Sequence, residues 1–200
     1  MGALPDNTGG FDRRIALYRL GALGLLLTPL AGGCGHGNGV PMMGDCGGSG
    51  SMPSWMMDDG MMDPAMMGDM QTIMDLLNNH QLIRRTVEDI DGGIRSVTTS
   101  ADPRLAGLIR THVAAMKTRI EQGHPIRHGD PLFREIFNHH TEITLVVSDL
   151  PEGVEVRETS ANPQVTLLIR QHARAAVSAF VAEGMPAAMR PTPLPPGYRP

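Results

Sequence analysis

Methionine is concentrated in one stretch of the chain, SMPSWMMDDGMMDPAMMGDM, from Ser51 to Met70. This stretch holds eight of the 15 methionines, three times as adjacent pairs, among aspartate, glycine and proline. Thioether sulfur is an uncharged, soft ligand that selects Cu(I) over harder cations. The composition therefore predicts copper binding. The candidate ligands are Met56, Met57, Met61, Met62, Met66, Met67 and Met70.

The spacing of these methionines fits neither a helix nor a strand, so packing in a core explains them poorly. With its glycines and aspartates, the stretch resembles the methionine-rich segments of periplasmic copper-handling proteins, and the resemblance implies copper as its ligand. The alternative is a flexible spacer of low complexity that binds nothing. Both interpretations agree that the segment is too polar and too broken to fold alone.

Four histidines form the second candidate site. Two histidines, each on the apolar face of a predicted helix, are repeated sixty residues later. The four are His80, His112, His140 and His172. Imidazole binds copper, zinc and haem iron. Met116 follows His112 by one helical turn, so His80, His112 and Met116 predict a mixed nitrogen and sulfur site. The alternative is a core histidine whose ring hydrogen-bonds a hairpin threonine or a backbone carbonyl.

The second histidine pair has no equivalent sulfur ligand, since Ala176 stands sixty residues after Met116. Two equal metal sites are therefore not expected. Enzyme motifs are missing from the sequence: there is no His-Glu-x-x-His, no Cys-x-x-Cys, no phosphate-binding glycine loop and no Gly-x-Ser-x-Gly. Ser100 and Ser160 precede predicted helices, which explains both hydroxyls without catalysis. We therefore expect a protein that is not an enzyme.

The elements that position the histidines are predicted twice. An apolar stripe of helical spacing ends at His80 and again at His140. The turns DGG and PEG then each predict a β-hairpin, although IRRTVE could instead continue the first helix. Asp102 and Asn162, each followed by proline, are typical helix N-caps. The prediction is an α+β fold in which a duplicated helix-hairpin-helix module builds a four-stranded antiparallel sheet covered by helices.

The repeat is visible without gaps, since HQLIRRTVEDIDGGIRSVTTSADPRLAGLIRTHVAAM aligns with HTEITLVVSDLPEGVEVRETSANPQVTLLIRQHARAA sixty residues later. The chain from Met70 onward resembles an uncharacterised group of bacterial exported proteins that carry the pattern IRRTV…TTSxDP…IRxH twice. This resemblance supports a duplicated module and implies no particular activity.

The N-terminus predicts export. DRRIALYR is a positive region, and LGALGLLLTPLAGG is an apolar run ending in small residues directly before Cys34. The order LAGGC resembles the lipobox of bacterial lipoproteins, which implies a lipid anchor on Cys34; the alternative is ordinary cleavage near Gly33 and a disulfide between Cys34 and Cys46. The predicted organisation is a signal peptide at 1–33, a tether at 34–68, a duplicated domain at 69–190 with repeats at about 70–122 and 130–184, and a proline-rich tail at 191–200.

These features together predict a copper-binding lipoprotein on the periplasmic side of a bacterial cell envelope, serving metal sequestration or delivery. Its expected partners are the membrane, through Cys34, and a protein that donates or accepts the metal. The net charge of -4, without a run of like charges, argues against binding of nucleic acid. Two alternatives stay open: a non-catalytic structural or partner-binding module on a tether, and a haem-binding protein that uses the histidine pairs.

Overall fold

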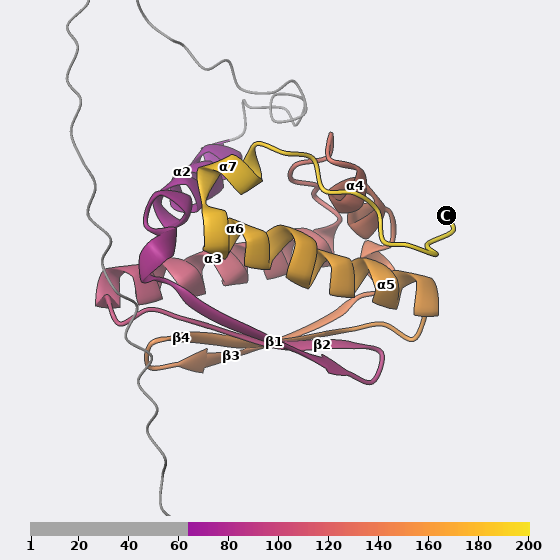
Figure 1. Ribbon diagram of the computed structural model, residues 1–200, viewed down its shortest axis with the longest axis horizontal. Helices are drawn as coiled ribbons and strands as arrows, with labels where there is room; N and C mark the ends of the chain where they lie inside the picture. The colour runs from indigo at the N-terminus through magenta and orange to yellow at the C-terminus, as the bar shows by residue number, and fades with distance from the viewer. Residues whose placement is uncertain (1–63) are drawn as a thin grey trace, which may run out of the picture. The chain divides into compact units, whose positions relative to one another are not determined.

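The structure, a computed structural model, describes residues 64–200. Over this range the chain has the predicted α+β class: one four-stranded antiparallel sheet carries the helices on a single face (Figure 1). No helix among the described residues is long and apolar enough to cross a membrane. The predicted signal peptide, the lipidation of Cys34 and the candidate ligands Met56, Met57, Met61 and Met62 lie outside the described residues.

The sheet consists of two hairpins that meet along their second strands. Its order is β1-β2-β4-β3, with every pair antiparallel. The strands are β1 (Arg84–Ile90), β2 (Gly93–Thr99), β3 (Thr144–Leu150) and β4 (Gly153–Thr159). At the centre Ser96 pairs with Val156, which lies sixty residues later. Both predicted hairpins are confirmed, and continuation of the first helix through IRRTVE is wrong, because a 3-10 turn, His80–Leu82, separates that helix from β1.

Two helices begin at a capped proline, as predicted. In α3 (Pro103–Gln122) the Asp102 side chain accepts hydrogen bonds from two backbone N–H groups, and in α5 (Pro163–Gln171) Asn162 accepts one. These caps satisfy donors that have no partner within the helix. Asp130 starts α4 (Pro131–Asn138) in the same way.

The two halves of the domain, residues 64–123 and 130–184, cross over each other. Ile94 of β2 packs against Val165 and Ile169 of α5, whereas Val154 of β4 packs against Ile109 of α3. Each core therefore combines a strand of one half with a helix of the other. Two arginines also form hydrogen bonds between the two halves. The Arg110 guanidinium donates to the carbonyl oxygen of Leu150 at 3.1 Å, and that of Arg170 donates to the carbonyl oxygen of Ile90 at 3.2 Å.

The folded domain begins earlier than the sequence predicts. Helix α2 (Pro64–Asn78) starts inside the segment assigned as a tether, so the boundary at residue 68 is wrong. Met66 is 6% exposed and packs with Ile126 and Phe137, while Met67 is 64% exposed. The last methionine pair thus provides one side chain to a hydrophobic core, an explanation that its irregular spacing disfavoured.

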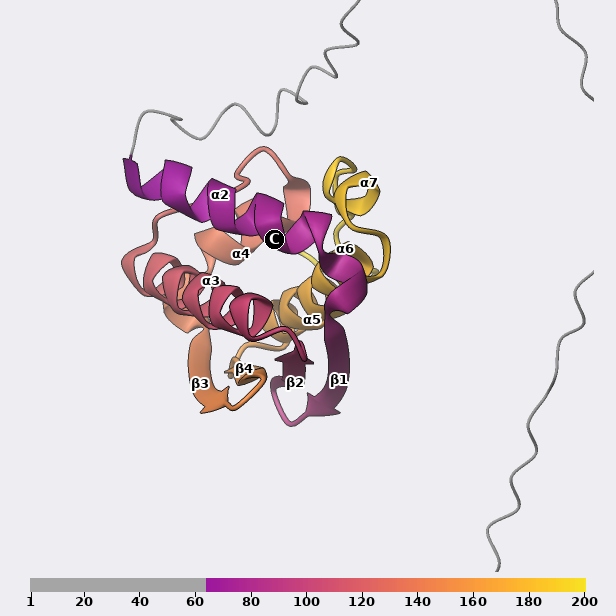
Figure 2. The same cartoon turned by 90° about the vertical axis from the view of Figure 1, so that its left-hand side faces the viewer.

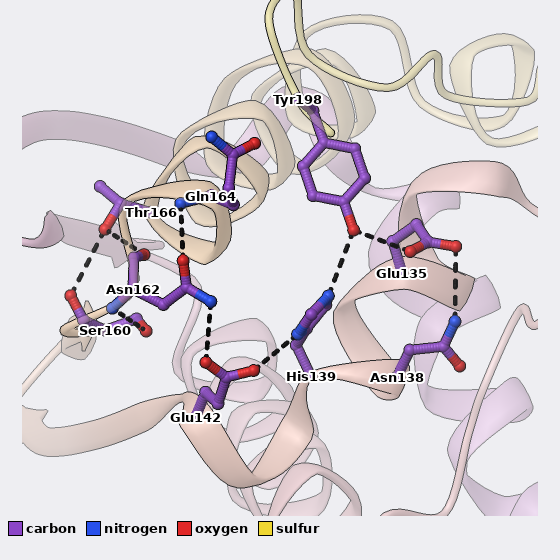
Figure 3. A network of polar contacts seen from close by, with 9 residues as sticks. All are labelled: Glu135, Asn138, His139, Glu142, Ser160, Asn162, Gln164, Thr166 and Tyr198. Carbon is purple, nitrogen blue, oxygen red and sulfur yellow. Dashed lines mark hydrogen bonds and ion pairs between the residues drawn. The ribbon is translucent and has the colours of Figure 1, made fainter. Parts of the chain in front are cut away.

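The proline-rich tail packs against the domain instead of extending away from it. The Thr192 amide donates to the fully buried Asp130 carboxylate at 2.7 Å. Further along, the Tyr198 hydroxyl donates to Glu135 at 2.8 Å and lies 3.2 Å from Nε2 of His139 (Figure 3). Burial, with the Glu135 carboxylate as the next cause, raises the pKa of Tyr198 to about 12. The tail is therefore part of the folded domain.

Candidate functional site

His80 and His140 hold the ends of helices. Nδ1 of His140 lies 2.9 Å from the carbonyl oxygen of Ile120, near the end of α3, and Nδ1 of His80 lies 2.9 Å from that of Val181 in α6 (Ala179–Glu183). A carbonyl oxygen only accepts, so Nδ1 carries the proton in both rings. Each imidazole thereby satisfies a carbonyl in the last turn of a helix belonging to the other half.

A glycine lies under each of these rings. Gly123 and Gly184 have φ angles of +64° and +68°, a conformation that glycine adopts without steric cost. A Cβ atom at Gly123 would lie 2.7 Å from Nε2 of His140, and one at Gly184 would lie 2.5 Å from Cδ2 of His80. The same histidine and glycine pair thus ends α3 and α6, which supports the alternative of a core histidine bonded to a backbone carbonyl.

The last long helix is not α-helical throughout. Residues His172–Ser178 form a π-helix between α5 and α6, and the Ser178 hydroxyl donates to the carbonyl oxygen of Ala173. Gly123 and Gly184 are consequently 61 residues apart instead of sixty. Val177 therefore lies 61 residues after Met116 and, like Met116, lines the cavity described next. Neither Ala176 nor Val177 supplies sulfur, so the predicted asymmetry remains.

A cavity of about 280 Å³ lies between the helices and the covered face of the sheet, and its lining is mainly apolar. It is bordered by α2, α3, α4, the π-helix, α6 and all four strands; Figure 2 shows these helices on the same side of the sheet. The cavity brings together candidates from distant parts of the sequence. It is lined by Met66, Met70, His80, His112, Met116 and His172, but not by Met67 or His140.

His112 and His172 differ from the other two histidines because their Nδ1 atoms are buried and have no hydrogen-bond partner among residues 64–200. Burial lowers the pKa of His112 to about 4, with a small opposing effect of Asp69 and a small lowering by His172. Its imidazole is therefore neutral at pH 7 and keeps a lone pair for a metal or a hydrogen-bond donor. The His172 ring meets the Phe133 ring edge-on, with centroids 5.3 Å apart.

The cavity contains the predicted set and one further histidine. It is lined by His80, His112 and Met116, which the sequence places in one half, and also by His172 of the other half. Sulfur lies at the same cavity: Met70, Met74 and Met116 line it along with Met66. Within residues 64–200, no three of the histidine, cysteine, aspartate and glutamate side chains are placed to hold a metal ion. A metal would need the thioethers or a cofactor of its own.

Polar side chains from the sheet complete the cavity, and sequence reasoning missed them. Arg85, Ser96, Thr98 and Glu158 line it on the strand side. A signal was present in the repeat: the residues sixty positions after Arg85 and Ser96 are Leu145 and Val156, and both line the same cavity. The strand residues that line the cavity form three pairs sixty residues apart: Arg85/Leu145, Ser96/Val156 and Thr98/Glu158. At two of these three pairs the first half has a polar side chain where the second half has an apolar one, and at the third pair both side chains are polar.

Glu158 is the acidic member of this floor. It is 6% exposed, and its carboxylate oxygen lies 3.8 Å from Nδ1 of His172. At that separation the two groups attract each other when His172 is protonated, but they are too far apart for a hydrogen bond.

Comparison with protein-family models, with curated proteins and with solved structures finds no match for the chain.

Proposed function

We propose that this protein binds haem in the cavity of its folded domain, with the imidazoles of His112 and His172 as the ligands of the iron, and that it acts by binding and not by catalysis. The observation that carries the proposal is a pair of buried imidazole nitrogens that have no hydrogen-bond partner among residues 64–200 and that belong to residues lining a mainly apolar cavity. Buried polar atoms in native proteins are rarely left unsatisfied, so each such atom calls for an explanation. A bound ligand provides one.

The size of the cavity favours an organic ligand. Small-molecule sites are mostly apolar, have a few polar groups that fix orientation, and measure about 300–1,000 Å³, so this cavity lies at the lower end of their range. A single metal ion needs only a few donor atoms close together and would leave most of 280 Å³ empty. A macrocycle with its own metal uses the apolar wall and the imidazoles at the same time. Haem iron is commonly held by histidine.

The chemistry of the two histidines supports the same ligand. A metal binds the neutral form of imidazole, and burial keeps His112 neutral at pH 7. The two residues stand at equivalent positions, sixty apart, on helices of opposite halves. Two ligands from two separate helices suit a planar group bound on both faces.

Copper(I) is the second candidate, because four thioethers line the cavity that His112 and His172 share. They are Met66, Met70, Met74 and Met116. Imidazole and thioether sulfur together are suitable ligands for Cu(I). On this alternative the methionine-rich segment before α2 would bind further copper, as the sequence predicts.

The rest of the proposal concerns origin and location. We propose that the domain arose by duplication of a helix-hairpin-helix module, supported by the sixty-residue correspondence of strands, helix caps and histidines. Export and lipid attachment at Cys34 remain proposals from the sequence alone, as does a protein partner that exchanges the ligand.

The two candidates are separated by titrating the mature chain, prepared without its ligand, with haem and in parallel with Cu(I) under chelator competition. Haem binding predicts one equivalent per chain and a shifted Soret band. Cu(I) binding that saturates without any haem binding would support the copper alternative instead. If the protein binds neither ligand, the structural or partner-binding module takes their place.

A further inference from the structure

Arg85 is a charged residue of the cavity floor whose hydrogen bonding is incomplete. It lies on β1, and it lines the cavity at the position where the second half has Leu145. One of its terminal nitrogens donates to the Thr98 hydroxyl at 2.7 Å, but its Nε atom is buried and has no hydrogen-bond partner among residues 64–200. No ion pair of Arg85 is found within that range.

This guanidinium is nevertheless charged. Burial lowers the pKa of Arg85 to about 10, and the negative charge of the Glu158 carboxylate opposes this shift. Arg85 is half-buried, and a charge largely removed from water without a close counter-ion is costly, so such groups in proteins are usually paired or bind a ligand. The guanidinium has five N–H donors, of which the Thr98 hydroxyl takes one. The remaining donors suit the two oxygen atoms of a carboxylate.

We infer that Arg85 binds a carboxylate of the ligand and so determines which way round the ligand enters the cavity. The inference rests on the proposed function, since haem carries two propionate groups on an otherwise apolar ring. The floor of the cavity has a charged side chain at Arg85 and apolar side chains at Leu145 and Val156, and this difference determines the orientation of the ligand. The carboxylate lies at Arg85, and the apolar edge of the ring lies at Leu145 and Val156. Glu158 repels an anion, so the carboxylate takes the Arg85 side.

The test compares haem with haem dimethyl ester, in which both carboxylates are masked and the macrocycle is unchanged. Both ligands are titrated into the ligand-free chain and into the variants Arg85→Gln and Arg85→Lys. Arg84→Gln is the matched control, because Arg84 is the exposed neighbour on the same strand and does not line the cavity.

The expected result is a loss of haem affinity in Arg85→Gln of roughly tenfold to a hundredfold, the range of a charge-assisted hydrogen bond. The ester should bind this variant and the unaltered chain equally. Arg85→Lys should retain part of the preference for the free acid, and Arg84→Gln should retain all of it.

Two outcomes overturn the inference. An equal loss of affinity for haem and its ester in Arg85→Gln would show that Arg85 only supports the fold, and an unchanged preference for the free acid would show that another group binds the carboxylate. Absence of haem binding by the unaltered chain contradicts the proposed function itself, which is a different result from either.

Discussion

The four repeated histidines divide into two kinds by the partners of their Nδ1 atoms. In His80 and His140 this atom donates to a helix carbonyl, and His140 does so without lining the cavity. The hydrogen bond from Nδ1 is therefore explained by the helix carbonyl that it satisfies, without a ligand in the cavity. In His112 and His172 the same atom has no hydrogen-bond partner among residues 64–200. Identical residue types at equivalent spacing thus make different contacts, although His80 lines the cavity together with His112 and His172.

The low pKa of His112 predicts a pH dependence of stability. The folded value is about 4, and the usual value in an unfolded chain is about 6.5. Between these pH values the unfolded chain binds a proton that the folded chain does not, so stability falls as the pH falls from 6.5 to 4 and is unaffected above 6.5. The loss is on the order of 3 kcal/mol at most.

Denaturant unfolding of the ligand-free protein at several pH values measures this effect. His112→Gln should be less sensitive to acid over that interval than the unaltered chain. His124→Gln, which removes an exposed histidine, should show the unaltered dependence. If His112→Gln retains the full acid sensitivity, the imidazole is not held neutral by burial.

At the scale of elements, hairpins and helix starts were predictable because their causes are local. Asp102 and Asn162 precede prolines, and DGG and PEG are turn sequences, so each determines a boundary without help from the rest of the chain. The start of α2 was not predictable, since Met66 is buried by Ile126 and Phe137, which lie far away in sequence. The packing of the tail was not predictable either, since its Thr192 amide donates to Asp130, which also lies far away in sequence.

The π-helix left a signal in the sequence that an ungapped comparison misses. Gly123-His124-Pro125 recurs as Gly184-Met185-Pro186, 61 residues later instead of sixty. The extra residue must therefore lie between Pro163 and Gly184, and the structure places it in the turn that begins at His172. Insertions of this kind often occur at functional sites, in agreement with the role proposed for His172.

The helix ends under His80 and His140 provide a stability prediction. Gly184→Ala and Gly123→Ala should each lower the free energy of unfolding by roughly 1–3 kcal/mol, because alanine is strained at these φ angles and its Cβ would overlap an imidazole. Gly107→Ala is the matched control. It lies inside α3 with no atom within 4 Å of the added Cβ, and it should stabilise by about 0.5–1 kcal/mol.

Thermal or denaturant unfolding of the three variants checks this prediction. If Gly184→Ala is as stable as the unaltered chain, the imidazole of His80 is not packed on the helix end, and the separation of structural from ligand-binding histidines loses its basis.

At the scale of the whole domain, the crossing of the two halves explains why the site joins them. Helices α3 and α5 each pack on a strand of the opposite half, so the cavity is lined by both halves and belongs to neither. From the sequence, the histidines appeared as two pairs, each within one repeat. The pairing of His112 with His172 could not be predicted, because it depends on this crossing and on no local pattern.

The central claim is that His112 and His172 bind the iron of haem, and the most direct measurement is the electronic and electron paramagnetic resonance spectrum of the haem-loaded protein. The unaltered chain should give a low-spin, six-coordinate spectrum. His112→Ala and His172→Ala should each give a high-spin spectrum that free imidazole restores, while His124→Ala should match the unaltered chain. Retention of the low-spin spectrum and of haem affinity by both cavity variants would contradict the claim.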